Sequence, residues 1–371
     1  MSTSLRVLVA GAGIAGLTAA TAFHDFGWDV DLVERRETLD AIPTGLFIPS
    51  NGMRAFASLG VASGLRSRGH EIERLNVRIP GGGASSSASV EAVWPNVGPS
   101  IGIERKTAVR TLLRSCPITV QWGTAVQGLT QHGKRVTVTL SDDTRSDYDL
   151  VVGADGVNST VRLQAWPDAV AQYAGDTWWR GVAPAPDGLD TWELCLCQEG
   201  MMLAEPIGHD LAYWTAGTYS LQQFDDPVAD RAKRVRKQFG DADGPHAEIL
   251  AQVEDDSSVQ FSPAFQVLVS HPVQGRVVLI GDAAHAIGPN MAQGASMAAE
   301  DVLVLTRELA WATDIDAALA RYAIRRAART RYVHEATAMR NRAAQTGDRE
   351  HLVQEWPRLS IQSFAALVPP P

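Results

Sequence analysis

Small and acidic residues gather at residues 281–295, which read GDAAHAIGPNMAQGA. An apolar run at 277–280 precedes this stretch, and an amphipathic pattern follows it. A strand that enters a helix through small residues lets the backbone approach a phosphorylated or aromatic ligand, and the free N–H groups at the helix start favour negative charge. Asp282 would accept hydrogen bonds from sugar hydroxyls in such a site. The alternative is an ordinary strand–turn–helix in which Asp282 only caps the helix.

Glycines that would also let the backbone approach a ligand lie near the N-terminus, where Gly11, Gly13 and Gly16 follow an apolar run at 5–10. A helical pattern continues from them to about residue 27. The three glycines would allow a tight turn, close approach of the backbone to a pyrophosphate, and close packing of helix on strand. The motif in this context predicts a dinucleotide site, for either NAD or FAD.

An acidic residue lies at the expected distance from these glycines. The predicted second strand, 29–33, ends in Glu34, which is placed to accept hydrogen bonds from ribose hydroxyls. Arg35 and Arg36 come next, and they are either a solvated charged pair or neighbours of the adenosine.

Two further strand ends carry polar residues. An apolar run at 150–152 leads into Gly153-Ala-Asp155-Gly156, and Ser159 is available to cap the helix that follows. Arg105 opens another predicted helix, either as a surface charge or as a ligand of a phosphate or flavin. Because the carboxyl ends of parallel strands meet at one edge of a sheet, these residues are expected to lie together.

Composition limits the function classes. The chain has 371 residues, enough for two domains or for one large α/β domain with an insertion. A net charge of −9 argues against nucleic acid and anionic membrane surfaces as partners. No apolar run is long enough to span a bilayer, and the first residues lead almost directly into a strand, so we expect no signal peptide. Cys116, Cys195 and Cys197 have no metal spacing, so we predict no metal site and a reduced, cytoplasmic protein.

The elements that must position these residues differ along the chain. Residues 166–272 are rich in Trp and Tyr and alternate apolar with polar residues, which predicts an antiparallel sheet with one face free to cover a ligand. A hairpin is expected from 72–79 and 90–94, with GGGASSSAS as its tip, and 225–256 resembles a pair of surface helices. One long helical tract is predicted from 302 to about 346. Its arginines are expected to form a solvated face: Arg321, Arg325, Arg326, Arg329 and Arg331.

Three motifs together resemble the single-component FAD-dependent aromatic hydroxylases, the group of para-hydroxybenzoate, salicylate and urate hydroxylases. They are GAGIAG at 11–16 with Glu34, GADGVNSTVR at 153–162, and GDAAHAIGP at 281–289. The chain departs from the family pattern at Ala292 and Ser296, where the family usually has Gly and Asn. The resemblance implies a Rossmann-like FAD-binding domain of the α/β class, an inserted antiparallel substrate sheet, and a long C-terminal helix. The implied FAD-binding segments are 1–71, 101–165 and 273–310, with a substrate hairpin at 72–100, a substrate sheet at 166–272 and a helical region at 311–371.

The resemblance also implies residue roles. Asp282 would hold the ribityl chain, Pro289 and the backbone at 292–295 would lie beside the flavin pyrimidine, and Asp155 would serve both FAD and a transient NADPH or NADH. His285 is expected to be a structural hydrogen-bonding residue. The full set of expected cofactor residues is Gly11, Gly13, Ala15, Gly16, Glu34, Arg35, Gly45, Arg105, Val126, Asp155, Gly156, Asp282, Pro289, Gln293, Gly294 and Ala295.

By the same resemblance, reduced flavin would react with O2 to a C4a-hydroperoxide that hydroxylates or epoxidises a small aromatic or polycyclic apolar substrate, in a monomer or homodimer. Tyr213 and His209 are candidates for proton transfer, and Arg180 either pairs with a substrate carboxylate or phenolate or forms a surface salt bridge. An aromatic wall is expected from Trp178, Trp179, Trp192, Trp214 and Tyr213, with plain packing as the alternative for about half of them. The alternative functions are a flavoprotein dehydrogenase or reductase without oxygen insertion, and a non-catalytic flavin-binding protein.

Overall fold

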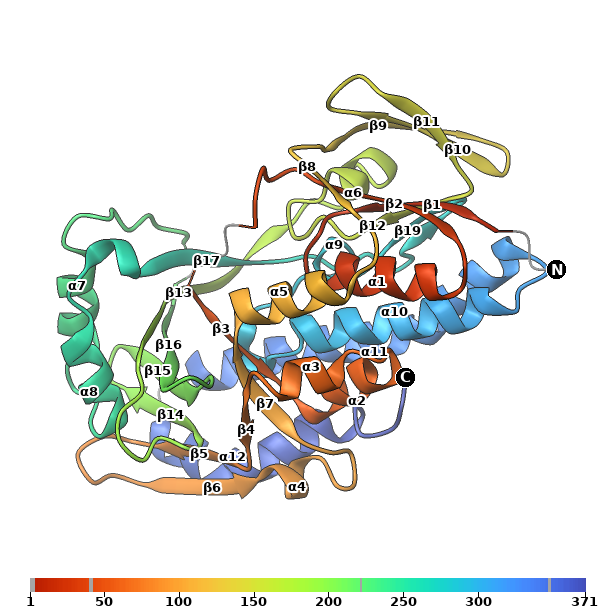
Figure 1. Ribbon diagram of the computed structural model, residues 1–371. Coiled ribbons are helices and arrows are strands. Elements are labelled where there is room, and N and C mark those ends of the chain that lie inside the picture. Colours follow the sequence, from red (N-terminus) through yellow and green to blue (C-terminus); the bar gives the residue numbers. More distant parts are fainter. Residues whose placement is uncertain (1–3, 40–42, 221, 346–347) are drawn as a thin grey trace.

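The N-terminal motif lies on a six-stranded sheet of order β18-β19-β12-β1-β2-β8 in the computed structural model, which describes residues 4–39, 43–220, 222–345 and 348–371 (Figure 1). The neighbours from β19 to β8 are parallel, and only β18 runs antiparallel. The strands are β1 (Arg6–Ala10), β2 (Asp29–Glu34), β8 (Val120–Trp122), β12 (Leu150–Gly153), β18 (Val273–Gln274) and β19 (Val277–Leu279). Because the central strands are buried on both faces, they are continuously apolar, as the sequence predicted.

Helices and a small sheet cover the two faces of this sheet. On one face Val7 and Val9 pack with α1 (Ile14–Asp25), α5 (Arg105–Ser115) and α10 (Gly294–Ala310). On the other face Leu8 and Ala10 pack with α6 (Thr160–Ala165) and with a three-stranded sheet of β9 (Val126–His132), β10 (Arg135–Leu140) and β11 (Arg145–Tyr148). The alternation of side chains along β1 decides which residue meets which layer.

A seven-stranded sheet of order β17-β13-β16-β15-β14-β5-β6 holds the aromatic-rich segment. Its strands are β5 (Arg74–Arg78), β6 (Ser85–Ser89), β13 (Gln172–Pro184), β14 (Trp192–Cys197), β15 (Gly200–Pro206), β16 (Leu211–Tyr219) and β17 (Gln260–Gln266). Helices α7 (Arg231–Gln238) and α8 (Pro245–Gln252) lie against one face, on the left of Figure 1, and the short 3₁₀ turn η1 (Asp256–Ser258) follows α8. On the opposite face, residues 349–365 pack on β5 and β14, and the remainder lines a cavity.

Short elements join the two large sheets. A three-stranded sheet of order β3-β7-β4 contains β3 (Gly45–Ile48), β4 (His70–Ile72) and β7 (Ser100–Glu104). The helices α2 (Ser50–Ser58) and α3 (Ala62–Arg66) follow β3, and the turns α9 (Asp282–His285) and η2 (Pro289–Met291) lead from β19 to α10. None of the described helices is long and apolar enough to cross a membrane.

The expected hairpin differs from the structure in its second strand. That strand is β6, Ser85–Ser89, which lies in the serine stretch expected to be a flexible tip, and residues 90–93 instead form the helix α4 (Val90–Val93). Serine has little strand propensity, but cross-strand pairing with β5 and the packing of α12 against β6 override it.

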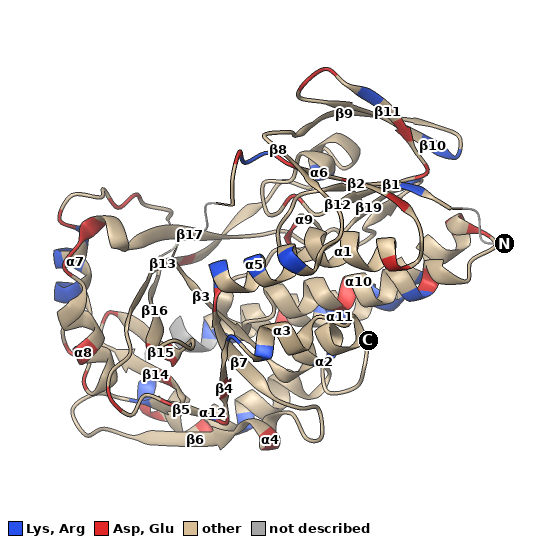
Figure 2. Ribbon diagram, in the orientation of Figure 1, with Lys and Arg blue, Asp and Glu red and all other residues tan. Residues whose placement is uncertain are grey.

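The expected long C-terminal helix is divided. Helix α10 ends at Ala310 and α11 (Ile315–Gln345) begins after a short turn; the expected end near residue 346 lies outside the described residues. A further helix, α12 (Arg349–Ala365), returns to pack on α4 and β6. The prediction that the arginines form a solvated face was wrong for Arg326 and Arg329. Their side chains are only 1% and 10% exposed, and both form ion pairs with Glu300 of α10. Figure 2 shows acidic positions of α10 beside basic positions of α11.

Candidate functional site

One large cavity lies between the carboxyl ends of the nucleotide-sheet strands and the open face of the seven-stranded sheet. Its volume is about 810 Å³. Most of the residues singled out from the sequence line it: Gly11, Gly13, Ala15, Glu34, Arg35, Gly45, Arg105, Val126, Asp155, Gly156, Arg180, Tyr213, Asp282, Pro289, Gln293, Gly294 and Ala295. The fold therefore brings the three motifs, far apart in the chain, to one space.

The glycine turn after β1 has the geometry that a phosphate needs. A Cβ on Gly11 would lie 2.5 Å from the Ala154 carbonyl oxygen, and one on Gly16 would lie 1.7 Å from the Gly11 oxygen, so larger residues are excluded at both positions. Gly13 precedes α1 without a side-chain cap, and its missing Cβ faces open space. The N–H groups at the start of α1 are thus open to an anion. Gly16 does not line the cavity; it allows α1 to pack closely on the turn.

Two carboxylates fix the backbone on this side of the cavity, Glu34 at the glycine turn and Asp155 at the start of α6. Glu34 Oε2 accepts a hydrogen bond of 2.9 Å from the Ala12 N–H. Asp155 accepts bonds from the backbone N–H groups of Thr160 and Val161 at 2.7 and 3.1 Å, and from the Ser159 hydroxyl. Burial raises the pKa of Asp155, and these hydrogen bonds oppose the shift.

The third motif forms the far wall of the nucleotide half. Asp282 begins α9 at the exposed edge of the cavity and forms no hydrogen bond within the described part of the chain, so it does not serve as a helix cap. Arg105 faces the same space at the start of α5. Burial lowers the pKa of Arg105, and the neighbouring Asp282 carboxylate opposes this shift. An acceptor and a cation are thus held on opposite elements, both available to a ligand.

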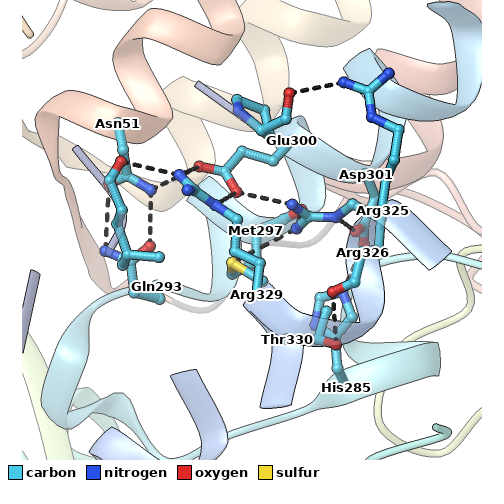
Figure 3. Close-up of polar contacts among 12 residues, drawn as sticks. Asn51, His285, Gln293, Met297, Glu300, Asp301, Arg325, Arg326, Arg329 and Thr330 are labelled. Carbon is cyan, nitrogen blue, oxygen red and sulfur yellow. Dashed lines mark hydrogen bonds and ion pairs between the residues drawn. The ribbon is translucent and has the colours of Figure 1, made fainter. Parts of the chain in front are cut away.

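A buried ion-pair network anchors the loop that carries this motif (Figure 3). Arg326 on α11 bonds Asp301 at 2.7 Å and Glu300 at 3.0 Å, and Arg329 bonds Glu300 at 2.6 Å. Burial would raise the pKa of Glu300, but the charges of Arg326 and Arg329 outweigh it and hold that pKa below its ordinary value. The carboxylates of α10 are therefore fully charged and fully paired.

The same carboxylates reach the motif itself. Asp301 accepts a 2.8 Å bond from the Gly281 N–H and a 2.6 Å contact from His285 Nε2. Asn51 on α2 connects Glu300 with Gln293 through two bonds of 2.9 Å. His285 accordingly has a structural hydrogen bond, as the sequence suggested, and the network sets the path of residues 281–293.

Ala292 lies in this loop with a left-handed backbone, φ 50° and ψ 31°. This is the position at which the sequence departs from the glycine of the family pattern. An L-residue in this conformation is strained, because its Cβ approaches the following carbonyl oxygen.

The wall of the substrate half consists of alternate residues of the seven-stranded sheet. Trp178, Trp192 and Tyr213 line the cavity. Trp179 and Trp214 point to the opposite face and belong to the core beneath α7 and α8, so the expectation of a five-residue aromatic wall was wrong for these two. The reason is the two-residue period of a strand.

Of the expected catalytic residues, two reach the cavity. Tyr213 packs so close to β3 that a Cβ on Gly45 would lie 2.3 Å from the Cβ of Tyr213. Burial raises the pKa of Tyr213 although Arg180 opposes the shift, so its hydroxyl is protonated at neutral pH. Arg180 donates to the Ser262 hydroxyl at 2.5 Å inside the cavity wall rather than on the surface. His209 is exposed on the turn between β15 and β16 and does not line the cavity, so no contact supports a role in proton transfer.

Two further charged residues line the cavity that the sequence reasoning did not select. Glu205 on β15 is fully buried, and Arg340 on α11 lies under the rings of Trp356 and Phe364, with its Cζ atom 4.5 and 5.7 Å from their centroids. Glu205 shares its face with Met201 and Leu203 at two-residue spacing, a signal that was available in the sequence. Arg340 owes its surroundings to α12, which no local pattern indicates.

The glycine turn, the acidic strand ends and the apolar sheet around one cavity are the arrangement of a nucleotide-dependent oxidoreductase that encloses an organic substrate. A family described as FAD binding domain matches residues 4–337. The aurachin C monooxygenase/isomerase of Stigmatella aurantiaca is 32% identical over 370 residues, which cover 96% of this chain and 94% of that protein. The 2-heptyl-3-hydroxy-4(1H)-quinolone synthase of Pseudomonas aeruginosa is 31% identical and covers 82% of this chain and 80% of its own.

A solved structure has the same fold. Klebsiella pneumoniae HpxO, complexed with FAD and uric acid, superposes with a TM-score of 0.86 and 24% identity over 99% of this chain and 96% of that chain. The chain therefore belongs to the FAD-binding-domain family of flavoprotein aromatic monooxygenases, and its cofactor is FAD. The α/β class with an FAD-binding and a substrate sheet is confirmed.

Proposed function

We propose that this protein uses FAD, NADPH or NADH, and O2 to hydroxylate or epoxidise an aromatic or polycyclic apolar small molecule. The observation that carries the proposal is the continuity of one cavity from the glycine turn of β1 to the apolar face of β14–β16. Two relatives that share about a third of their residues with this chain are named as an aurachin C monooxygenase/isomerase and as a 2-heptyl-3-hydroxy-4(1H)-quinolone synthase. Substrates of that kind are flat and largely apolar, which suits the wall of Trp178, Trp192 and Leu203.

The residues present fit FAD. The start of α1 and the cradle at Gly11 would take the pyrophosphate, Glu34 the adenosine ribose, and Asp282 the ribityl hydroxyls. Pro289 and the backbone at 292–295 would lie along the pyrimidine side of the ring, next to the start of α10. When bound, FAD would accept a hydride from the nicotinamide and then activate O2.

The chain's own side chains would orient the substrate and exclude water. Apolar residues of β14 and β15 line one side of the cavity, and apolar residues of α12 line another. A bound ring would therefore displace water from the reaction space. Tyr213, which lines the cavity and whose pKa is raised by burial, would donate a hydrogen bond to a substrate oxygen. Arg180 is placed to stabilise negative charge on the same face of the sheet.

The first experiment compares FAD retention by the wild type, Asp282→Ala, and a matched exposed variant, Asp187→Ala, which lies outside the cavity. We expect Asp282→Ala to lose FAD on gel filtration while Asp187→Ala keeps a stoichiometric amount. A D282A protein that retains stoichiometric FAD would contradict the placement of the cofactor. The control separates loss of a ligand group from a general effect of removing charge.

The second experiment tests the reaction class. Anaerobic addition of NADPH or NADH should bleach the flavin faster when a suitable aromatic compound is present, and turnover under ¹⁸O2 should place one labelled atom in the product. A product without added label would assign the protein to the dehydrogenases or reductases instead. Gel filtration with light scattering distinguishes a monomer from a homodimer, the two states that the sequence left open.

A further inference from the structure

Glu205 is a buried carboxylic acid of the cavity wall, and both of its side-chain oxygens lack a partner within the described residues. It stands in β15 directly opposite Tyr213 of β16, so the two side chains share the face that lines the cavity. Its relative exposure is 0%, and neither carboxyl oxygen has a hydrogen-bond partner among the residues that the structure describes. A buried polar group without a partner is costly, so its presence in a ligand cavity points to a ligand group as the partner.

The charge state of Glu205 follows from its neighbours. Within the described residues no cation forms an ion pair with Glu205, and the charges of Arg180 and Arg105 act on its cross-strand neighbour Tyr213. Burial, with no compensating cation, raises the pKa of Glu205 well above its ordinary value. Burial therefore favours the uncharged carboxyl, which offers one O–H donor next to one carbonyl acceptor.

We propose that Glu205 is the polar anchor that selects the substrate: it accepts a hydrogen bond from a ring N–H or O–H and donates its own O–H to an adjacent acceptor. The substrate class is then a neutral heteroaromatic ring with a donor and an acceptor side by side, such as a cyclic amide or a hydroxylated nitrogen heterocycle. A substrate carboxylate is disfavoured at this position, because it offers no donor and brings a second acid beside Glu205. The inference rests on the proposed function, because it places the substrate in this cavity.

Arg180 and Arg340 are the competing determinants of substrate choice. Both are cations that line the cavity, and either would favour a carboxylate if it faced the substrate's polar group. Arg180 is already bonded to Ser262 on β17, whereas the Cζ atom of Arg340 lies over the rings of Trp356 and Phe364 on the α12 side. A preference for carboxylates would therefore assign recognition to one of these arginines and overturn the role of Glu205.

The test measures binding of three probes to the FAD-loaded protein through the change that each causes in the visible flavin spectrum. The probes are 2-quinolinone, which has a donor beside an acceptor, 2-methoxyquinoline, which lacks the donor, and quinoline-2-carboxylate. We expect the wild type to bind 2-quinolinone at least about ten-fold more tightly than the other two. Tighter binding of the carboxylate, equal binding of all three, or no spectral change with any of them would overturn the proposal.

Variants identify the residue responsible. Glu205→Leu should reduce the ratio between 2-quinolinone and 2-methoxyquinoline to near unity, and the isosteric Glu205→Gln, whose amide keeps a donor and an acceptor, should preserve most of it. Leu203→Ala, two residues away on the same face, should weaken all three probes alike. If the E205L protein keeps FAD and still binds 2-quinolinone about ten-fold more tightly than 2-methoxyquinoline, another residue must accept the hydrogen bond from the ring N–H.

The outcomes separate this inference from the proposed function. Binding needs no turnover, so the probe ratios stand or fall whether or not oxygen is inserted into a product. If E205L does not retain FAD, the wild-type ratios and E205Q still decide the question. If the product contains no ¹⁸O but the protein still prefers 2-quinolinone, the proposed monooxygenase reaction is wrong, whereas the role of Glu205 in substrate binding is supported.

Discussion

Two buried polar regions of the protein, one behind the loop of residues 281–293 and one on the cavity face of the seven-stranded sheet, differ in whether their carboxyl groups have hydrogen-bond or ion-pair partners. Between α10 and α11, Glu300 and Asp301 are fully buried and paired with Arg326, Arg329 and other donors (Figure 3). On the cavity face of β13–β16, Glu205 is equally buried but has no partner within the described residues. The first region is complete without a ligand, and the second is not.

This difference distinguishes buried polar groups that stabilise the fold from a buried polar group that is available to bind a ligand. A satisfied network holds one conformation, here the path from Gly281 to Gln293 that presents the cofactor loop. An unsatisfied group raises the free energy of the folded protein until a ligand completes it. Burial of charge alone would not have distinguished the two regions; the inventory of partners does.

The largest effect is expected from breaking the satisfied network. Arg326→Met leaves two buried carboxylates without their common cation, so the free energy of unfolding should fall by about 3–5 kcal/mol, measured by urea denaturation. Arg329→Met is the matched control and should cost less, because Arg329 is 10% exposed and Glu300 would retain Arg326. Equal losses in the two variants would show that the network does not depend on its fully buried member.

The opposite sign is expected on the cavity face. Glu205→Leu replaces an unpartnered carboxyl with an apolar side chain, so the free energy of unfolding without ligand should rise by about 1–3 kcal/mol. The same urea experiment measures this change, with Glu205→Gln as a control that keeps a buried polar group and should gain little. A destabilised E205L protein would mean that Glu205 has a structural partner after all.

The pH dependence of stability should also have opposite signs in the two regions. Because the folded pKa of Glu205 is raised, the wild type loses stability relative to Glu205→Gln as pH rises from the ordinary Glu value towards the raised one. Because the folded pKa of Glu300 is lowered, the wild type loses stability relative to Glu300→Gln as pH falls below the ordinary value. Urea denaturation between about pH 3 and pH 8 measures both differences, and parallel trends would contradict the contrast.

The sequence predicted most of the cofactor half because its signals are local. The elements β1, α1 and β2 were predicted nearly to the residue, and Asp282 and Asp155 end strands whose carboxyl ends meet in a parallel sheet. Gly16 could be interpreted for the same reason, since a Cβ there would meet the Gly11 carbonyl oxygen of its own motif, whereas the contact at Gly11 is with Ala154 from a distant segment.

The sequence did not predict the partners of the buried charges, because these depend on distant segments. Arg326 looked like one of several surface arginines until α11 packed on α10, which brought it to carboxylates 25 and 26 residues away. Trp179 and Trp214 are packing residues because the alternation of side chains along each strand turns them away from the cavity, and the aromatic content alone did not show which of the five would line it. Glu205 could have been selected from that alternation, but its lack of a partner is visible only in the assembled cavity.

The smallest effect concerns the loop between the two regions. Ala292 has a left-handed backbone, so Ala292→Gly should relieve strain and raise the free energy of unfolding by about 0.5–1 kcal/mol. Ala298→Gly, the same substitution inside α10, should lower it by a similar amount, because glycine is unfavourable in a helix interior. Since neither change touches the ion-pair network or Glu205, both effects should be independent of pH between 5 and 8. If Ala292→Gly instead destabilises the protein, the alanine has a packing role in the loop that outweighs its backbone strain, and the loop would then depend on its own side chains as well as on the network behind it.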